Sequence, residues 1–242
     1  MKLTKRINLM FGEERAALYD VEIQHLMDRG YDEKDINAFL ENYALTIGVF
    51  DILSMFTRSK LSVNDLEKSL SFLFSRHKMI TETLAKHLEP NCRILDVGCG
   101  RGLVTCSLAL KNFEVHGVDI SVDALEIANK LAHKLGCRPT FHLIEGNDLP
   151  FADSYFDAAF CVWTLHEIPQ DQIQKISKEL HRVLRKMGNV LIIDQEGVAS
   201  FEIIKTSMSQ SGFKLGLEKS LSTVYDHGRA SQALLLKCVK EP

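Results

Sequence analysis

The stretch RILDVGCGRG, residues 93–102, decides how the rest of the chain is interpreted. An apolar run containing one acid, Asp96, leads into glycines at alternate positions, Gly98, Gly100 and Gly102, and then into the apolar-rich LVTCSLAL. This pattern predicts a buried strand, a tight turn and the start of a helix. Because glycine lacks a Cβ, the turn can take positive φ and let another molecule lie against backbone N–H groups at a helix N-terminus. We expect a polar ligand at this turn.

A second acid follows the next apolar strand, residues 113–118. This residue, Asp119, stands where the second strand of a βαβ unit commonly holds the two hydroxyls of a ribose. Ser121 can cap the following helix, which leaves Asp119 for a ligand rather than for the helix N-terminus. Dinucleotide sites use GxGxxG to seat a pyrophosphate, whereas the GxGxG spacing here suits a nucleoside without phosphate.

On these residues the chain resembles the class I S-adenosylmethionine-dependent methyltransferases. Their first motif resembles ILDVGCGRG at 94–102, and their second resembles HGVDIS at 116–121. Further similar stretches are EGNDLPFADSYFDAAF at 145–160, LHEI at 165–168 and VLRKMGNVLIID at 183–194, although Lys186 and Met187 stand where relatives often have Pro and Gly. The resemblance implies an α/β fold with a doubly wound, seven-stranded, mostly parallel sheet of order 3-2-1-4-5-7-6. Residues 89–242 would form this Rossmann-like domain, and residues 1–88 an N-terminal all-helical cap.

The same resemblance implies which residues bind the cofactor, S-adenosyl-L-methionine. Glu145 would accept a hydrogen bond from the adenine amine while Gly146 donates its N–H; a shifted register would use Asn147 or Asp148, and the alternative for Asp148 is a turn before Pro150. Asp96 would bond either loop N–H groups or the cofactor ammonium, because a buried acid needs partners. The full expected set is Asp96, Gly98, Cys99, Gly100, Gly102, Asp119, Ile120, Glu145, Gly146, Asn147, Cys161 and Val162.

Methyl transfer requires an aligned nucleophile and, where that nucleophile carries a proton, a base. His166 is the candidate base with Glu167 beside it, and the alternative for His166 is a structural role at a helix start. A carbanion, thiolate or free amine would need no base. The fourth strand ends in CVWT rather than the Asn/Asp-Pro-Pro-Tyr/Phe of enzymes that methylate nucleobase amines, and its Trp163 is either a pocket wall or a core residue.

Composition and net charge limit the classes of partner and the cellular location that we expect for the protein. The 242 residues are 45% hydrophobic with a formal net charge of −3, which does not favour nucleic acid as the main partner. Six cysteines without a CxxC motif or a Cys/His cluster predict reduced thiols in a cytoplasmic protein and no metal site. No stretch is long and apolar enough for a membrane span, and we do not expect the first residues to act as a signal peptide. A homodimer is compatible with the sequence, which does not fix the oligomeric state.

Periodicity gives the expected elements. A helix is expected over 13–29, ending at Gly30, and others open near Asp32 and Ser62. Strands are expected at 93–97, 113–118, 140–144, 157–163, 189–194, 213–219 and 232–239, with helices at 102–110, 122–135, 170–186 and 199–211. Gly188 is expected to cap the helix that begins at residue 170.

We therefore interpret the sequence as an enzyme that methylates a small molecule. Alternatives are a protein or RNA methyltransferase, an aminopropyl transferase of the same fold, or a non-catalytic module that only binds the cofactor. The side chains expected at the substrate pocket are Tyr19, His25, Phe39 and Tyr43 of the helical region and Tyr225, Asp226 and His227 of a late loop, with packing in the core or a solvated turn as their alternatives.

Overall fold

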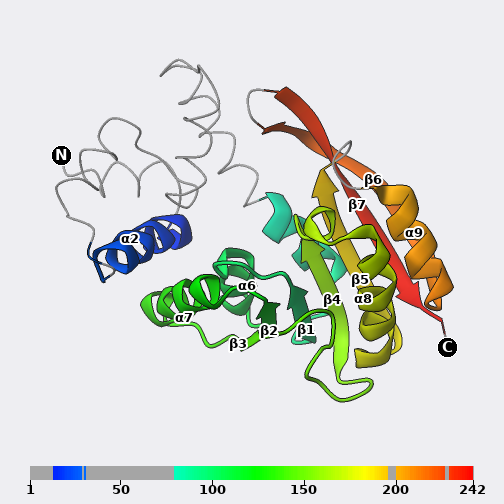
Figure 1. Ribbon diagram of the computed structural model, residues 1–242, viewed down its shortest axis with the longest axis horizontal. Coiled ribbons are helices and arrows are strands. Elements are labelled where there is room, and N and C mark those ends of the chain that lie inside the picture. The colour runs from blue at the N-terminus through cyan, green and yellow to red at the C-terminus, as the bar shows by residue number, and fades with distance from the viewer. Residues whose placement is uncertain (1–12, 29, 31–78, 196–199, 227–228, 242) are drawn as a thin grey trace.

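The computed structural model describes residues 13–28, 30, 79–195, 200–226 and 229–241 (Figure 1). Of the residues expected at the substrate pocket, Phe39, Tyr43 and His227 lie outside the described residues, as do the side chains of Tyr19, His25, Tyr225 and Asp226. The helices expected to open near Asp32 and Ser62 also fall outside them. Within the described ranges, no helix combines the length and the apolar character that crossing a membrane requires.

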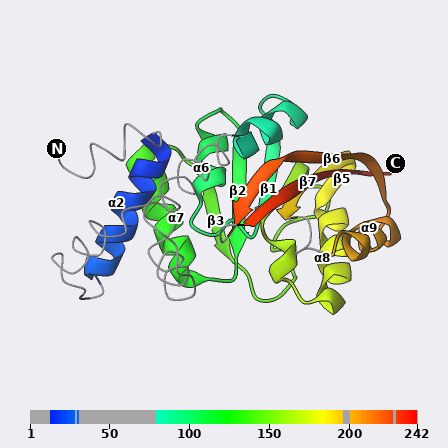
Figure 2. The same cartoon turned by 90° about the horizontal axis from the view of Figure 1, so that it is seen from above.

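A seven-stranded sheet forms the centre of the molecule, in the order β3-β2-β1-β4-β5-β7-β6 (Figures 1 and 2). The pairs among β1 to β5 are parallel, whereas β7 runs antiparallel to both β5 and β6. The predicted strand order is confirmed. The strands are β1 (Arg93–Val97), β2 (Glu114–Asp119), β3 (Thr140–Leu143), β4 (Phe156–Val162), β5 (Leu184–Gln195), β6 (Phe213–Asp226) and β7 (Arg229–Lys240).

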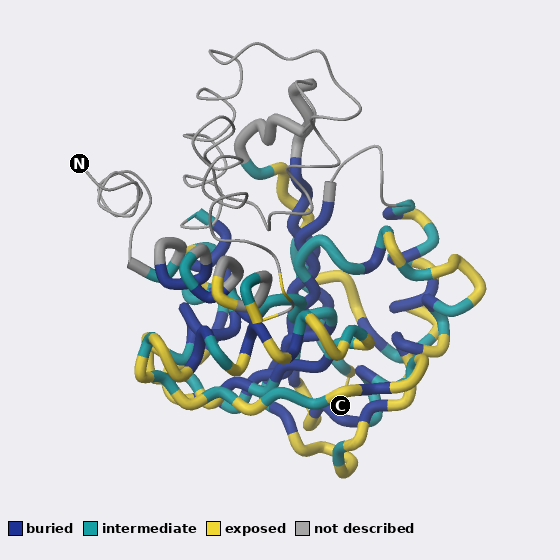
Figure 3. The backbone as a smooth tube through the Cα atoms, turned by 60° about the vertical axis from the view of Figure 1, so that its left-hand side comes forward, coloured by how far each residue is buried: buried dark blue, intermediate teal, exposed yellow. Residues whose placement is uncertain are grey.

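Helices cover both faces of the sheet, because the central strands carry apolar residues on both faces. These strands are mostly buried (Figure 3). One face packs against α8 (Gln170–Val183) and α9 (Phe201–Gln210) through residues such as Ile176 and Ile204. The other face packs against the helical residues 79–87 and α6 (Leu103–Ala109), with Leu84 and Leu108 fully buried. The carboxyl ends of β1, β2 and β4 therefore open between two helical layers.

The helix α2 (Glu13–Asp28) packs on the outside of α6 and α7 (Val122–Leu135) (Figure 2). Its buried residues Ala17, Leu18 and Val21 join an apolar cluster with residues of α6 and α7 such as Leu131. An exposed ion pair, Lys130 Nζ to Asp28 Oδ2 at 2.8 Å, lies beside this contact. The apolar contact supplies most of the stabilisation, because exposed ion pairs contribute little.

The ends of α7 follow the local sequence signals. Ser121 Oγ accepts a hydrogen bond from Ala124 N at 3.2 Å, and Gly136 ends the helix in the left-handed conformation. The predicted N-cap and the predicted bounds of 122–135 are confirmed.

The predicted cap at Gly188 is wrong. The helix α8 ends at Val183, and Gly188 belongs to β5, where an added Cβ would lie 2.9 Å from Arg185 O and 3.0 Å from Asp157 O. The fully buried Leu184 already pairs with β4, and Lys240 Nζ donates to His181 O and Leu184 O at 2.8 Å each. A lysine from β7 therefore donates hydrogen bonds to carbonyls at the end of the helix, where a glycine cap was expected.

The hairpin of β6 and β7 is longer than the sequence predicts. Tyr225 and Asp226, expected in a loop, pair with Ala230 and Arg229 as the last residues of β6. The register shifts between Ser220 and Thr223, and the hairpin continues beyond the rest of the sheet (Figure 1). Polar residues dominate this extension, so it lacks the apolar alternation from which strands are recognised.

Candidate active site

The turn between β1 and α6, here called the glycine loop (residues 98–102), is held by backbone bonds from the neighbouring strand. Gly98 N and Cys99 N both donate to Val118 O, at 2.9 and 3.0 Å. All three glycines have positive φ: 72° at Gly98, 51° at Gly100 and 76° at Gly102. The sequence prediction of a tight turn is confirmed.

The three glycines serve different purposes. A Cβ on Gly98 would overlap the Thr164 side chain, and one on Gly102 would lie 2.8 Å from Ala128 Cβ. A Cβ on Gly100 would meet nothing within 4 Å. Gly98 and Gly102 are therefore required by the packing of the protein itself, whereas Gly100 presents bare backbone to open space.

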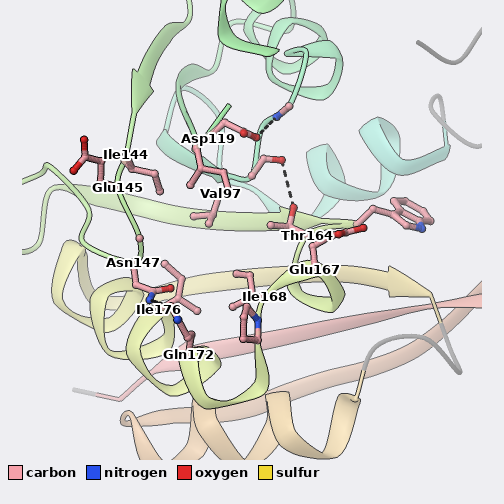
Figure 4. Close-up of a pocket in the computed structure, with 16 residues that line it drawn as sticks. Val97, Asp119, Ile144, Glu145, Asn147, Thr164, Glu167, Ile168, Gln172 and Ile176 are labelled. Carbon is pink, nitrogen blue, oxygen red and sulfur yellow. Dashed lines mark hydrogen bonds between the residues drawn. The ribbon is translucent and has the colours of Figure 1, made fainter. Parts of the chain in front are cut away.

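Asp119 ends β2 and ties the glycine loop to the next helix (Figure 4). Its Oδ2 accepts a hydrogen bond from Gly100 N at 2.7 Å, and its Oδ1 accepts one from Ser121 N at 2.9 Å. Hydrogen bonds to a carboxylate are stronger than neutral ones. The loop is thus fixed in position by the same carboxylate that the sequence assigns to a ribose.

The segment after β3 forms the opposite wall. Asn147 Nδ2 donates to Gln172 Oε1 of α8 at 2.6 Å, which joins the loop to the helix (Figure 4). Next along the chain, Leu149 N donates to Glu179 Oε2 at 2.9 Å. Arg182 donates to Leu149 O and Phe151 O at 2.8 and 2.7 Å, so α8 fixes the course of the chain on this side.

These segments enclose a cavity of about 670 Å³ at the carboxyl edge of the sheet (Figure 4). This volume lies within the range of small-molecule sites. Apolar side chains line much of it, and the polar groups come from a few positions. The lining residues are Val97, Gly98, Gly100, Asp119, Ile120, Ile144, Glu145, Gly146, Asn147, Trp163, Thr164, Glu167, Ile168, Pro169, Gln172 and Ile176.

Comparison with known proteins identifies the domain that holds this cavity. Residues 94–188 match the family described as a methyltransferase domain. Residues 94–188 are a methyltransferase domain, set in a sheet of order β3-β2-β1-β4-β5-β7-β6. The matched residues include the glycine loop, Asp119 and the segment of α8 that carries Gln172.

Two curated relatives share this methyltransferase domain. A sterol 4-C-methyltransferase of Caenorhabditis elegans is 32% identical over 141 residues, which are 57% of this chain and 40% of that protein. A 2-phytyl-1,4-naphtoquinone methyltransferase of Nostoc is 35% identical over 111 residues, 44% of this chain and 48% of that protein. The chain thus spans less than half the length of these two relatives.

A solved structure supports the fold of the methyltransferase domain. The magnesium protoporphyrin IX methyltransferase of Synechocystis, determined with bound S-adenosylmethionine, superposes with a TM-score of 0.60 at 18% identity. The similarity covers 78% of this chain and 91% of that one. At this level of identity the likeness establishes the arrangement of the elements.

Asp96 lies beneath the glycine loop of the methyltransferase domain and does not line the cavity. The residue is 2% exposed, and its Oδ2 accepts a hydrogen bond from Thr105 Oγ1 of α6 at 2.5 Å. Burial raises the pKa of the Asp96 carboxyl to about 7, the Thr105 bond opposes this, and the negative charge of Asp119 adds to it. Its partner in the structure is a hydroxyl on α6, which the sequence analysis did not consider.

His166 lies on a 3-10 turn, η1 (Leu165–Glu167), and does not line the cavity. Its Nδ1 lies 2.8 Å from Oδ1 of Asp194, a fully buried acid of β5, and its backbone N donates to Asp194 Oδ2 at 3.3 Å. Its Nε2 lies 3.2 Å from Glu167 Oε1. The hydrogen bond to Asp194 raises the pKa of His166, burial opposes the change, and the charges of Asp194 and Glu167 add to it.

The cavity brings together about half of the residues expected from the sequence. Those that line it are Gly98, Gly100, Asp119, Ile120, Glu145, Gly146, Asn147 and Glu167. The expected residues that do not line it are Asp96, Cys99, Gly102, Cys161, Val162 and His166. Sequence reasoning did not single out Val97, Ile144, Ile168, Pro169, Gln172 and Ile176. Gln172 is the informative omission, because it contacts the loop after β3 through Asn147.

Proposed function

We propose that this chain transfers the methyl group of S-adenosylmethionine to a small-molecule acceptor. The observation that carries the proposal is the open backbone at Gly100, which faces the cavity next to the carboxylate of Asp119. Bare backbone beside an acid, in a cavity with apolar walls, fits a nucleoside that carries an amino-acid group and no phosphate. The match of residues 94–188 to a methyltransferase domain supports the same chemistry.

In this proposal each wall binds one part of the cofactor. The glycine loop would lie against the methionine part, and Asp119 would accept hydrogen bonds from the ribose hydroxyls. Ile120, whose side chain is 71% exposed, would cover one face of the adenine. Glu145 and the Gly146 N–H would bind the adenine edge, while Gln172 holds the adjoining Asn147 in place. When bound, the sulfonium supplies an already activated methyl group, so the protein mainly aligns the acceptor.

A small acceptor is supported by the curated relatives, whose names are those of sterol and naphthoquinone methyltransferases. The Cys161 to Thr164 segment, which lacks the pattern of nucleobase amine methylation, agrees with this choice. We extend the proposal to a cytoplasmic location, because all six cysteines are free thiols. A homodimer is part of the same proposal. Light scattering, which measures the mass of the protein in solution, tests it.

Calorimetry with S-adenosylmethionine, its demethylated product and NAD tests the choice of cofactor. We expect the first two to bind and NAD not to bind, because no GxGxxG loop is present to seat a pyrophosphate. Asp119→Ala should weaken binding by about 1.5–3 kcal/mol, the range for a hydrogen bond to a charged group. Tight binding of NAD instead, or unchanged affinity in the variant, would contradict the proposal.

Turnover is tested separately, by release of the demethylated product when the protein is incubated with S-adenosylmethionine and fractionated metabolites. Release that depends on one small-molecule fraction supports methyl transfer. Binding without release in any fraction would favour a non-catalytic module, and release with protein or RNA fractions alone would favour the macromolecular alternatives.

A further inference from the structure

Trp163, the only tryptophan of the chain, lines the cavity directly after β4. Its φ of 52° lies in the left-handed region, which is a rare conformation for a residue with a bulky side chain. Trp163 N donates to Ile193 O of β5 at 2.9 Å. The next residue, Thr164, donates from Oγ1 to Gly98 O of the glycine loop at 3.3 Å. Contacts with two other segments thus hold a strained residue in place, and strain of this kind is common at functional sites.

The left-handed backbone changes the face of the sheet to which the tryptophan belongs. Side chains alternate between the two faces along a strand. Cys161 belongs to the apolar cluster on the face covered by α8, whereas Phe160 belongs to the cluster on the face covered by residues 79–87. Regular alternation would therefore place Trp163 on the α8 face, like Cys161. Trp163 instead packs against the cluster of Phe160 and Leu84, on the opposite face.

The proposed adenine site borders the other face of the sheet. Ile144 and Ile176 line the cavity and belong to the cluster on the α8 face. Ile144 directly precedes Glu145, which is proposed to bind the adenine edge. In Figure 4, Glu145 and Thr164 lie on different sides of Val97. The indole, which directly precedes Thr164 in the chain, therefore borders the cavity away from the adenine site, on the face opposite these two isoleucines.

We propose that Trp163 is a specificity-determining residue of the acceptor site, and that its indole stacks on a flat, apolar ring of the acceptor. This inference rests on the proposed methyl transfer, because it assigns to the acceptor the part of the cavity away from the adenine. Aromatic rings that stack gain free energy beyond the burial of their apolar area. Of the lining residues that follow, Ile168 adds apolar surface, and the carboxylate of the exposed Glu167 disfavours a negatively charged acceptor.

A tryptophan that served only the core would be placed differently. Packing against the cluster around Leu84 would stabilise the fold with or without a ligand, and another apolar side chain of similar volume would serve as well. Such a residue would be fully enclosed by the protein, whereas Trp163 is only partly buried and borders the cavity. The test must therefore separate the loss of a ring for a ligand from the loss of packing.

The fluorescence of the wild-type protein reports on this position without any substitution, because the chain contains one tryptophan. The full chain is saturated with the demethylated product of the cofactor and then titrated with indanol, which contains a flat ring, or with perhydroindanol, its saturated counterpart. We expect indanol to reduce the quenching of the indole by acrylamide. By calorimetry, we expect perhydroindanol to bind about tenfold more weakly than indanol, because a saturated ring does not stack.

Two substitutions of Trp163 and one control locate the effect. Trp163→Leu removes the ring and should weaken indanol binding about tenfold, whereas Trp163→Phe keeps a flat ring and should restore part of the affinity. Cofactor affinity should stay within about twofold of wild type in both variants. Phe113 packs against the same cluster but does not line the cavity, so Phe113→Leu should lower stability to urea and leave both affinities unchanged.

The outcomes separate this inference from the proposed function. Loss of cofactor binding in the wild type would refute the proposed function itself. Normal cofactor binding with equal affinity for indanol and perhydroindanol, or with neither bound, would overturn only the role of Trp163. A loss of cofactor affinity instead of indanol affinity in Trp163→Leu would also overturn it. If Trp163→Leu does not fold, the quenching measurement on the wild type still decides, because a structural indole is protected equally with and without indanol.

Discussion

Gly100→Ala gives the most direct test of where the cofactor lies. At φ 51° an alanine is strained, which costs about 1–2 kcal/mol of folding free energy. No further cost arises inside the protein, because the added Cβ meets no atom within 4 Å. The methyl group instead enters the cavity, where it would crowd a ligand that touches the backbone. Overpacking of this kind costs about 1–3 kcal/mol, which corresponds to a roughly 5- to 150-fold weaker affinity.

Gly136→Ala is the matched control for this variant. Gly136 has a similar φ of 68° and also has no atom within 4 Å of an added Cβ, but it ends α7 and does not line the cavity. Urea unfolding should show the same loss of about 1–2 kcal/mol in both variants, while calorimetry with S-adenosylmethionine should show weaker binding only for Gly100→Ala. Equal affinities in the two variants would show that the cofactor does not lie against Gly100.

Three further predictions concern the supports of the site. The pKa of the buried Asp96 is about 7 in the folded protein and 3.8 in the unfolded chain, so the stability of the wild type should fall as the pH rises from about 4 to 7. Asp96→Asn should remove that fall, and thermal melts across this pH range test it. Arg182→Ala should cost about 2 kcal/mol in urea unfolding and weaken cofactor binding, since Arg182 holds the carbonyls of Leu149 and Phe151; Arg182→Lys should not restore either. Lys240→Met should cost about 1–3 kcal/mol in urea unfolding without changing cofactor affinity, because its two bonds, to His181 O of α8 and Leu184 O of β5, lie outside the cavity.

The parts of the fold that the sequence predicts are those whose conformation is determined by residues close together in the chain. The strand, turn and helix around Gly98, Gly100 and Gly102 follow from residue types within one short stretch. The bounds of α7 follow from Ser121 and Gly136, which satisfy backbone groups within the same helix. In these cases local geometry and tertiary structure favour the same conformation.

The wrong predictions fall where a contact with a residue distant in the sequence determines the structure and overrides the local sequence pattern. Gly188 has the sequence position of a helix cap, but Leu184 is needed in the sheet, and Lys240 of the last strand already bonds His181 O of the helix and Leu184 O just after it. The end of α8 thus depends on β7, which lies far along the chain. The hairpin extension at Tyr225 shows the same effect, because the pairing of β6 with β7 determines its length rather than its own apolar pattern.

The residues of the candidate site also fall into those that local motifs predict and those that depend on contacts between distant segments. The contacts assigned to the cofactor come largely from the turns after β1 and β2, where Asp119 bonds Gly100 across adjacent strands and both residues fall in recognisable motifs. The surroundings of His166 depend on the register between β4 and β5, which brings Asp194 to His166, although nothing in the stretch around either residue specifies the other. A shift of that register by one residue would point Asp194 to the other face of the sheet. The cofactor residues and the candidate His166 could therefore be predicted from the sequence, whereas the contact of His166 with Asp194 required the structure.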